Sequence, residues 1–189
     1  MIDDALLEQC KRGSEPAFRA MYYRTMPRVR AWVTRFVGPG AAVADVVQDV
    51  YVQVYRSIAT FRGDAAFGTW LYRITLNVAT SALRRAGRAE RGLDHDAPPD
   101  APRGRDEERR LQAREDLRRL YAALDTLTHD KRAAFVLYEL EGRSLREIAD
   151  ITESPVPTVA ARLRRARLEL VAAFGANAIP ATARISEDS

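Results

Sequence analysis

One segment of low apolar content divides this chain of 189 residues into two parts that each need a core of their own. Residues 86–108 combine glycines and prolines with charges of both signs and carry almost no apolar side chains. Such a segment cannot bury enough surface to offset the entropy lost on ordering, so it is expected to be flexible.

On both sides of this segment, apolar residues recur every three or four positions, which is the period of an amphipathic helix. The sequence therefore predicts an all-α protein with two small helical domains, an N-terminal bundle at residues 1–88 and a second domain at residues 113–175. A flexible linker at residues 89–112 joins them, and a disordered tail follows at residues 176–189.

The first part of the chain is predicted to hold two helical segments, at residues 3–37 and 41–57. Gly13 interrupts the first segment, and Ser14 can cap the helix that continues after it. Pro27 is expected to kink or restart that helix, because proline lacks the N–H that an interior helical position donates.

The helix at residues 41–57 has two opposite faces. Its valines share one side, while Asp45, Gln48 and Asp49 lie on the other. This polar stripe is either a solvated face or a docking surface for a partner protein. The two carboxylates are not predicted to act in acid–base catalysis, because nothing near them in the sequence indicates a pocket that would shift a pKa.

A third helix is predicted at residues 67–85, after a turn signal at residues 63–64. Its apolar stripe is expected to face the core and contains Phe67, Leu71, Ile74 and Val78. A second stripe lies beside it and contains Trp70, Arg73, Asn77, Ser81 and Arg84. An exposed aromatic ring beside arginines suits stacking on unpaired bases while the guanidinium groups bind phosphates. The alternative is a surface helix whose tryptophan covers an edge of the core.

The second domain carries the signals of a helix-turn-helix. Ser144 and Glu147 form a capping box before a short amphipathic helix. Residues 152–154 then fit a tight turn, with Ser154 and Pro155 as the expected cap and first residue of a longer helix. That helix is predicted to bury Val156, Val159, Leu163, Ala166 and Leu170. It is predicted to expose Thr158, Arg162, Arg164, Arg165 and Arg167. In a helix-turn-helix the second helix enters the major groove of DNA, whereas an ordinary helical hairpin would simply leave these arginines solvated.

Composition excludes several other classes of protein. The formal net charge of +4 and the isoelectric point near 9.5 permit a nucleic-acid partner. The single Cys10 cannot form an internal disulfide, and neither His95 nor His129 has a second ligand at metal-binding spacing. We therefore expect no catalytic residues, no metal and no cofactor, and the protein is not expected to be an enzyme. No signal peptide or membrane span is expected, which predicts a cytoplasmic protein.

Both halves resemble one known family. The sequence DVVQDVY at residues 45–51, FRGDAAF at residues 61–67 and TWLYRITLN at residues 69–77 resemble the extracytoplasmic-function (ECF) sigma factors of bacterial RNA polymerase, within the sigma-70 family. In the second half, LEG at 140–142, EIA at 147–149, PVPTV at 155–159 and RLRRAR at 162–167 resemble the helix-turn-helix of the same family.

The resemblance implies roles for individual residues in transcription initiation. Docking on core RNA polymerase would use Asp45, Gln48 and Asp49. The minus-ten element would be captured as a flipped base around Phe61, Ile74 and Asn77, with Trp70 and Arg73 on the same segment and Arg84 and Arg85 holding phosphates. The minus-thirty-five element would face Arg164 and Arg165, with Thr158 and Arg162 placed for phosphate contacts. An anti-sigma factor is a further expected partner, and the linker would cross the polymerase.

Some positions depart from the family pattern. Ala160 and Ala161 replace a basic residue and a serine, Ser81 replaces an aspartate, and Glu153 and Ser154 replace a glycine and an aliphatic residue. These differences concern which promoter is read. A stand-alone helix-turn-helix regulator, with a ligand-sensing or dimerising N-terminal domain, is the alternative function.

Overall fold

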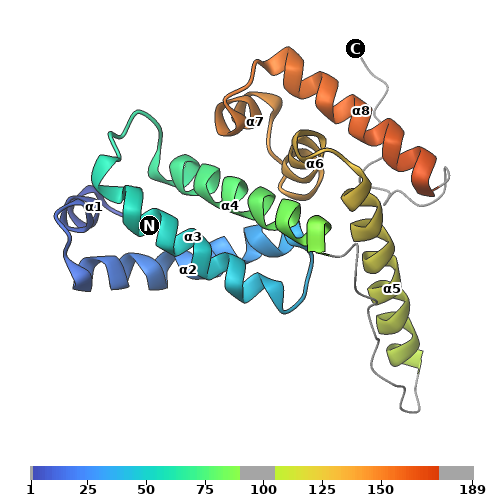
Figure 1. Ribbon diagram of the computed structural model, residues 1–189, viewed down its shortest axis with the longest axis horizontal. Coiled ribbons are helices and arrows are strands. Elements are labelled where there is room, and N and C mark those ends of the chain that lie inside the picture. The colour runs from blue at the N-terminus through green and yellow to red at the C-terminus, as the bar shows by residue number, and fades with distance from the viewer. Residues whose placement is uncertain (1, 90–104, 175–189) are drawn as a thin grey trace.

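The computed structural model of the chain describes residues 2–89 and 105–174, and all regular elements within these ranges are helical (Figure 1). The N-terminal half contains α1 (Asp4–Lys11), α2 (Glu15–Val37), α3 (Ala42–Ser57), the short 3₁₀ turn η1 (Ile58–Thr60) and α4 (Phe67–Ala89). The C-terminal half contains α5 (Arg105–Thr126), α6 (His129–Phe135), the π-helical turn η3 (Val136–Leu140), α7 (Leu145–Thr152) and α8 (Val156–Phe174). The all-α prediction is confirmed.

The N-terminal half is a bundle in which α2, α3 and α4 pack against one another. Its core is built from fully buried side chains such as Val33, Val50 and Val54. Ser14 caps α2 as predicted, since its hydroxyl accepts a hydrogen bond from the amide of Ala17. The predicted restart at Pro27 does not occur, because α2 continues through this residue without a break.

The prediction of the buried face of α4 is wrong. The face that is buried is rotated about the helix axis by about one residue, or roughly 100°, from the predicted one. Of the four residues predicted to be inside, only Leu71 is fully buried, and Phe67, Ile74 and Val78 are half-buried. The buried positions of α4 are Leu71, Tyr72, Thr75, Leu76 and Ala79. The reason is tertiary: α4 packs against α2 and α3 on one side and against α7 on another.

The C-terminal half begins earlier than the sequence predicted. Helix α5 starts at Arg105, inside the segment predicted as linker, and its first turns extend away from the other helices (Figure 1). Its residues are good helix formers, and pairs four positions apart, such as Gln112 with Asp116 and Glu115 with Arg119, support it. Of the predicted linker before Arg105, only Ala89 lies within the described residues. The predicted tail lies outside them.

The helix-turn-helix consists of α7 and α8. The predicted capping box is present, because the Ser144 hydroxyl accepts from the amide of Glu147 while the Glu147 carboxylate accepts from the amide of Ser144. Hydrogen bonds to its carboxylate lower the pKa of Glu147. The largest contribution comes from the backbone amide of Ser144, followed by the Ser144 side chain and Arg143. Helix α7 ends at Thr152, and the C-cap residue Glu153 adopts the left-handed conformation with φ of 51°.

Two details of α8 differ from the prediction. Ser154 does not cap the helix, because the carbonyl of Pro155 accepts the first amide bonds instead. Val156 is exposed rather than buried, while the other four residues predicted to face the core of this domain are all buried: Val159, Leu163, Ala166 and Leu170. Because α8 starts at Val156, one residue later than predicted, this first residue lies outside the contact between the helices.

The two halves also pack against each other, which the sequence did not predict. Helix α4 lies against α7, and the C-terminal end of α2 contacts α5, α6 and η3. Among the described helices, none combines the length and apolar content needed to cross a membrane.

Candidate nucleic-acid interface

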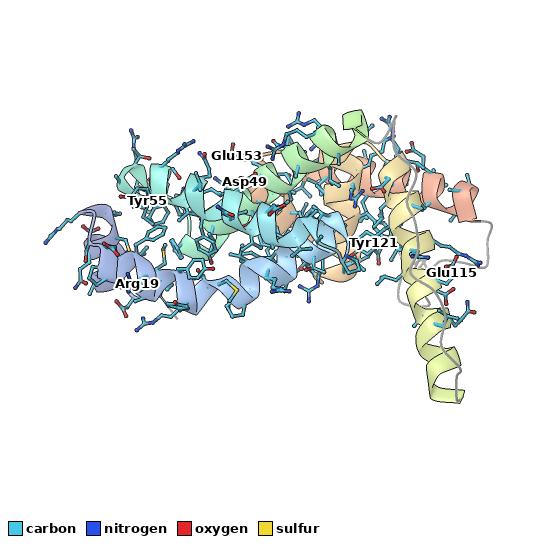
Figure 2. The ribbon with its side chains drawn as sticks, turned by 60° about the horizontal axis from the view of Figure 1, so that its bottom comes forward. Arg19, Asp49, Tyr55, Glu115, Tyr121 and Glu153 are labelled. Carbon is cyan, nitrogen blue, oxygen red and sulfur yellow. The ribbon has the colours of Figure 1, made fainter. Side chains whose placement is uncertain are left out.

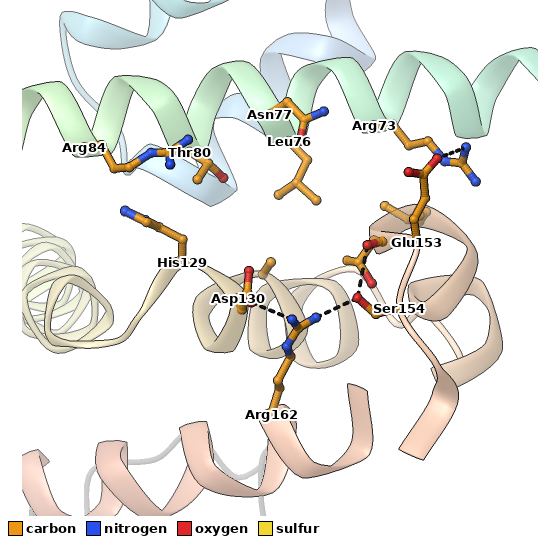
Figure 3. A pocket seen from close by; sticks show the side chains of 13 residues that line it. Arg73, Leu76, Asn77, Thr80, Arg84, His129, Asp130, Glu153, Ser154 and Arg162 are labelled. Atoms are coloured by element: carbon orange, nitrogen blue, oxygen red, sulfur yellow. Dashed lines mark hydrogen bonds and ion pairs between the residues drawn. The ribbon is translucent and has the colours of Figure 1, made fainter. Parts of the chain in front are cut away.

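The polar face of α4 forms one wall of a cleft between the two halves (Figure 3). Arg73, Asn77 and Arg84 project from α4, while the opposite wall carries Glu153 from the end of α7 and Arg162 from α8. The cleft has a volume of about 360 Å³. Three residues predicted to contact the minus-ten element and one predicted to contact the minus-thirty-five element therefore share a single cleft.

Arg73 is engaged by the helix-turn-helix. Its Nη1 atom lies 2.7 Å from Oε1 of Glu153, and its Nη2 atom donates to the carbonyl of Asp150 at 2.5 Å. The neighbouring Tyr72 is buried between the halves, with the guanidinium carbon of Arg143 5.9 Å from the centre of its ring. Burial raises the pKa of the Tyr72 hydroxyl, and the negative charge of Glu141 adds to that shift.

The loop before α4 encloses a second hollow of about 430 Å³. Phe61, Arg62 and Trp70 line it together with Arg73, which therefore borders both hollows. The ring centre of Trp70 lies 5.0 Å from that of Phe61 and 5.6 Å from that of Phe67. Trp70 thus packs against both phenylalanine rings of the loop and also borders the hollow.

Two predicted members of the base pocket lie outside this loop hollow. Asn77 lines the cleft on the other side of Arg73, and it is exposed there. Ile74 is half-buried and packs against the core. In this arrangement the residues that the resemblance groups around one flipped base are divided between two hollows.

The two arginines predicted to hold phosphates differ in their contacts. Arg85 pairs with Asp49 of α3, with 3.0 Å between Nη2 and Oδ2. Arg84 is exposed, donates weakly to the hydroxyl of Ser81 at 3.4 Å and faces His129 across the cleft. Burial, followed by the charges of Arg84 and Arg132, lowers the pKa of His129.

The outer face of α8 keeps only part of its predicted basic surface. Arg164, Arg165 and Thr158 are exposed. Arg162 instead bonds to the Asp130 carboxylate at 2.5 Å and to the Ser154 hydroxyl at 2.8 Å. Of the three arginines assigned to the minus-thirty-five element, Arg164 and Arg165 are thus directed to solvent, while Arg162 lies in the cleft.

Arg167 belongs to the structure of its own domain. It pairs with the Glu139 carboxylate, with hydrogen bonds of 2.8 and 2.5 Å, and lies over the ring of Tyr138. The side chain of Glu139 is only 7% exposed. Arg167 therefore neutralises a buried carboxylate, although helical spacing alone placed it on the outer face.

The predicted docking stripe lies on α3 beside an apolar groove. Asp45, Gln48 and Asp49 are all exposed on this helix. Next to Gln48, a groove of about 590 Å³ has four aromatic side chains among its nine lining residues. One of them, Tyr55, is 62% exposed, and Figure 2 labels it. This groove was not predicted from the sequence, although Gln48, Val52 and Tyr55 recur at helical spacing, which indicates a shared exposed face.

The wall of this groove is held by a buried hydrogen bond. The Tyr51 hydroxyl lies 2.7 Å from that of Thr25, which itself donates to the carbonyl of Met21. Tyr51 therefore donates to Thr25, and burial raises the pKa of Tyr51 to about 12. An uncharged, fixed tyrosine makes this surface suitable for protein docking, in which aromatic side chains are enriched.

The arrangement is suited to binding an anionic polymer, since arginines and amides border concave surfaces on two helices. Within residues 2–89 and 105–174, no group of three histidine, cysteine or acidic side chains is placed to hold a metal ion. His95 lies outside the described residues.

Comparison with known proteins relates both halves of the chain to one family. Residues 21–89 match the family model for Sigma-70 region 2, and residues 117–170 match that for Sigma-70 region 4. The chain is 37% identical over 175 residues to the ECF RNA polymerase sigma-E factor of Escherichia coli strain K12, covering 88% of this chain and 91% of that protein. The same factor of Haemophilus influenzae is 35% identical over 175 residues, covering 88% and 92%.

The fold is also similar to a solved structure of CnrH in complex with the cytosolic domain of CnrY. That comparison gives a TM-score of 0.62 and 28% identity, and it covers 92% of this chain and 97% of CnrH. The region 2 match contains α3, the loop before α4 and α4, and the region 4 match contains the helix-turn-helix. The chain therefore belongs to the ECF sigma factors, the alternative sigma factors that act in transcription initiation by bacterial RNA polymerase.

Proposed function

We propose that α4 and the loop before it read and help to melt the minus-ten element, while α8 reads the minus-thirty-five element. The observation that carries this assignment is the presence of two arginine-bearing faces in one chain, on α4 and on α8. Neither face has a nucleophile with a neighbouring base, so the protein acts by binding and catalyses no reaction itself.

The loop hollow supports the capture of one unpaired base. It is bordered by the rings of Phe61 and Trp70, which also pack against each other. Taking a base out of the duplex costs a few kcal/mol, roughly, which contacts to the exposed base edge must offset. Asn77, on the other side of Arg73, supplies an amide for a base that follows along α4, and Arg84 and Arg85 supply charge for the adjacent phosphates.

The exposed arginines of α8 support recognition of duplex DNA. A guanidinium bonds the O6 and N7 atoms of guanine through two parallel hydrogen bonds, which discriminate by about 1–3 kcal/mol. Arg164 and Arg165 are free to make such contacts, and Thr158 lies near the start of the helix, where phosphates are held.

The face of α3 is proposed to dock on core RNA polymerase. The amide of Gln48 borders the apolar groove, and the carboxylates of Asp45 and Asp49 are exposed on the same helix, so polar groups adjoin an apolar centre. The similar CnrH was solved in complex with the cytosolic domain of CnrY, which supports adding a regulatory protein of the anti-sigma type to the partners. With these partners, the protein is proposed to act in the cytoplasm.

Transcription in vitro tests the proposal. The full chain is combined with core polymerase of Escherichia coli, chosen because that organism supplies a 37% identical relative, and with a pooled library of random promoter sequences. We expect transcripts that start at defined positions and share two upstream sequence elements. Absence of such transcripts, together with absence of core binding in a pulldown, would contradict the proposal.

The same experiment addresses the alternative function. A stand-alone helix-turn-helix regulator would bind duplex DNA tightly by itself and would show no affinity for core polymerase. A sigma factor is instead expected to bind core polymerase more tightly than it binds duplex DNA by itself.

A further inference from the structure

Helix α1 precedes residues 21–89, the part of the chain that matches Sigma-70 region 2, and no role has been assigned to it so far. It packs against η1, the turn that leads directly into the loop before α4 (Figure 1). Leu7 and Cys10 are buried and fix the helix to the bundle. Lys11 follows Leu7 by four positions, so it lies on the same side of α1 as these packed residues.

The Lys11 side chain is held by two groups. Its ammonium Nζ lies 5.5 Å from the centre of the Phe61 ring. The same Nζ donates to Oε1 of Glu8, about one turn earlier in α1, at 2.8 Å. This hydrogen bond, followed by the positive charge of Lys11, lowers the pKa of Glu8, so the carboxylate stays ionised at neutral pH. The position of the ammonium relative to Phe61 is therefore fixed from both sides.

Phe61 connects Lys11 with the proposed base site. The ring of Phe61 borders the loop hollow of about 430 Å³, whereas Lys11 contacts that ring without lining the hollow itself. A base that leaves the stack and enters a pocket keeps its sugar and phosphates outside, because they continue into the rest of the strand. A cation beside the ring, and not underneath the base, is thus placed for the strand backbone.

Lys11 also keeps hydrogen-bonding capacity for a ligand. An ammonium carries three N–H donors, and Glu8 accepts one of them. The attraction to the Phe61 ring is electrostatic and acts on the whole charge. The remaining donors can bond phosphate oxygens, to which a lysine ammonium binds as a point charge.

The phosphate contacts proposed above do not reach this position. Arg84 lies roughly 21 Å along the axis of α4 from Trp70, at 1.5 Å per residue. Arg73 borders the hollow, but its guanidinium is engaged by the end of α7. Lys11 therefore supplies a positive charge where a base in the loop hollow would otherwise have its phosphates far from Arg84.

From these observations we propose that Lys11 binds a phosphate of the promoter strand whose base enters the loop hollow, so that α1 is part of the minus-ten site. This inference rests on the proposed function of the loop. An aromatic ring for the base and a cation for the backbone form the combination that single-strand binding uses. Because Glu8 and Phe61 hold the ammonium before DNA arrives, little side-chain freedom is lost on binding.

The decisive variant is Lys11→Met. It keeps an unbranched apolar side chain against Phe61 and removes the charge, so the packing of α1 is retained. Lys11→Arg is the rescue variant, because it restores the charge and the donors. Arg12→Met is the matched control, because Arg12 is the next residue, is exposed and carries the same charge at the same end of α1.

The measurement uses the full chain bound to core polymerase. The probe is a fluorescent single strand with the minus-ten element that the in vitro transcripts share, titrated at several salt concentrations. Lys11→Met should weaken binding about two- to five-fold at low salt, the range for one exposed charge pair. It should also reduce the slope of log K against log salt by about 0.7, the value for one phosphate of a single strand. Lys11→Arg should restore both values, and Arg12→Met should leave both unchanged.

Uncharged methylphosphonate linkages identify the phosphate. They replace the phosphates of the probe one at a time. At the linkage next to the captured base, the wild type should lose affinity while Lys11→Met should lose none further, which is the signature of a direct contact in a double-mutant cycle. Additive losses at every linkage would overturn the inference.

Two other results would also overturn it. One is a loss of affinity in Lys11→Met with an unchanged salt slope, since Lys11 would then only hold Phe61 in place. The other is an equal loss in Arg12→Met, which would come from the general charge of this helix end. Core binding should be the same for all variants, which excludes a folding defect. Phe61→Ala reports separately on the proposed function: if it binds the probe like the wild type, the base site itself fails, whatever Lys11→Met does.

Discussion

Individual residues of this sigma factor make contacts that their position in a motif does not reveal. Arg132 lies in no predicted site, yet it is almost fully buried and bonds both the Phe36 carbonyl and the Asp125 carboxylate. Arg85 and Asp49 are assigned to different partners, DNA and core polymerase, and they pair with each other in the free protein. The role of a charged side chain therefore depends on which partner is present.

Replacing Arg132 tests its buried role. Arg132→Met should lower the free energy of unfolding by about 1–3 kcal/mol, because the buried Phe36 carbonyl loses its donor. Urea unfolding followed by circular dichroism measures the change. Arg146→Met is the control, since Arg146 is exposed on α7. A loss no larger than that of the control would show that Arg132 contributes nothing specific.

Replacing Asn77 tests the proposed base contact. Asn77→Ala should slow open-complex formation about ten-fold, which corresponds to roughly 1.4 kcal/mol lost in the transition state. Core binding should be unchanged, because Asn77 lies on α4, away from the α3 surface. Permanganate footprinting of melted thymines and a core-binding titration give the two values. Equal loss in both would mean that Asn77 has a structural role.

At the scale of elements, α7 depends on its N-terminal cap. The helix has only eight residues, so it cannot be stable by propensity alone. The capping box at Ser144 and the packing of Ile148 against the domain core compensate for its length. The helix-turn-helix therefore tolerates changes on its outer face better than at its first residue.

Loss of the cap should be measurable. Ser144→Ala should cost about 1 kcal/mol of stability at neutral pH, the usual value for an N-cap. In the wild type, the cap weakens as the pH falls through the lowered pKa of Glu147, because the carboxylate is then protonated. The variant lacks this cap, so it should lose less stability than the wild type on acidification. Thermal unfolding across a pH series measures both effects. Ser57→Ala, at the end of α3, is the control, and a similar pH profile in both variants would argue against the cap.

At the scale of the whole molecule, the two halves pack against each other largely through charged and polar groups. Besides the buried Tyr72, the contact uses Arg132, Tyr121 and Arg73, all of which also form hydrogen bonds to backbone carbonyls. Such interfaces are typical of domains that separate during function.

His129 should make this packing depend on pH. It is surrounded by Arg84 from α4, Arg132 and Asp130 from α6 and Asp125 near the end of α5. Since the pKa of His129 is lowered where the halves pack, the packed arrangement binds fewer protons than separated halves would near the ordinary value of 6.5. The packing should weaken as the pH falls below about 6.5, and the radius of gyration measured by small-angle X-ray scattering should rise. His129→Gln should flatten this dependence, and an unchanged wild-type radius would contradict it.

The sequence by itself determined the helices, the two domains, the helix-turn-helix with its capping box and the family. These features depend on residues a few positions apart, whose spacing is visible in the chain. The tertiary structure alone decided which arginines are free and which are engaged. Arg73 and Glu153 are 80 positions apart, and Arg132 and Phe36 are 96 apart, so no local pattern pairs them. For the same reason, the buried face of α4 was predicted wrongly, because helices that pack on two of its sides determine which residues are buried.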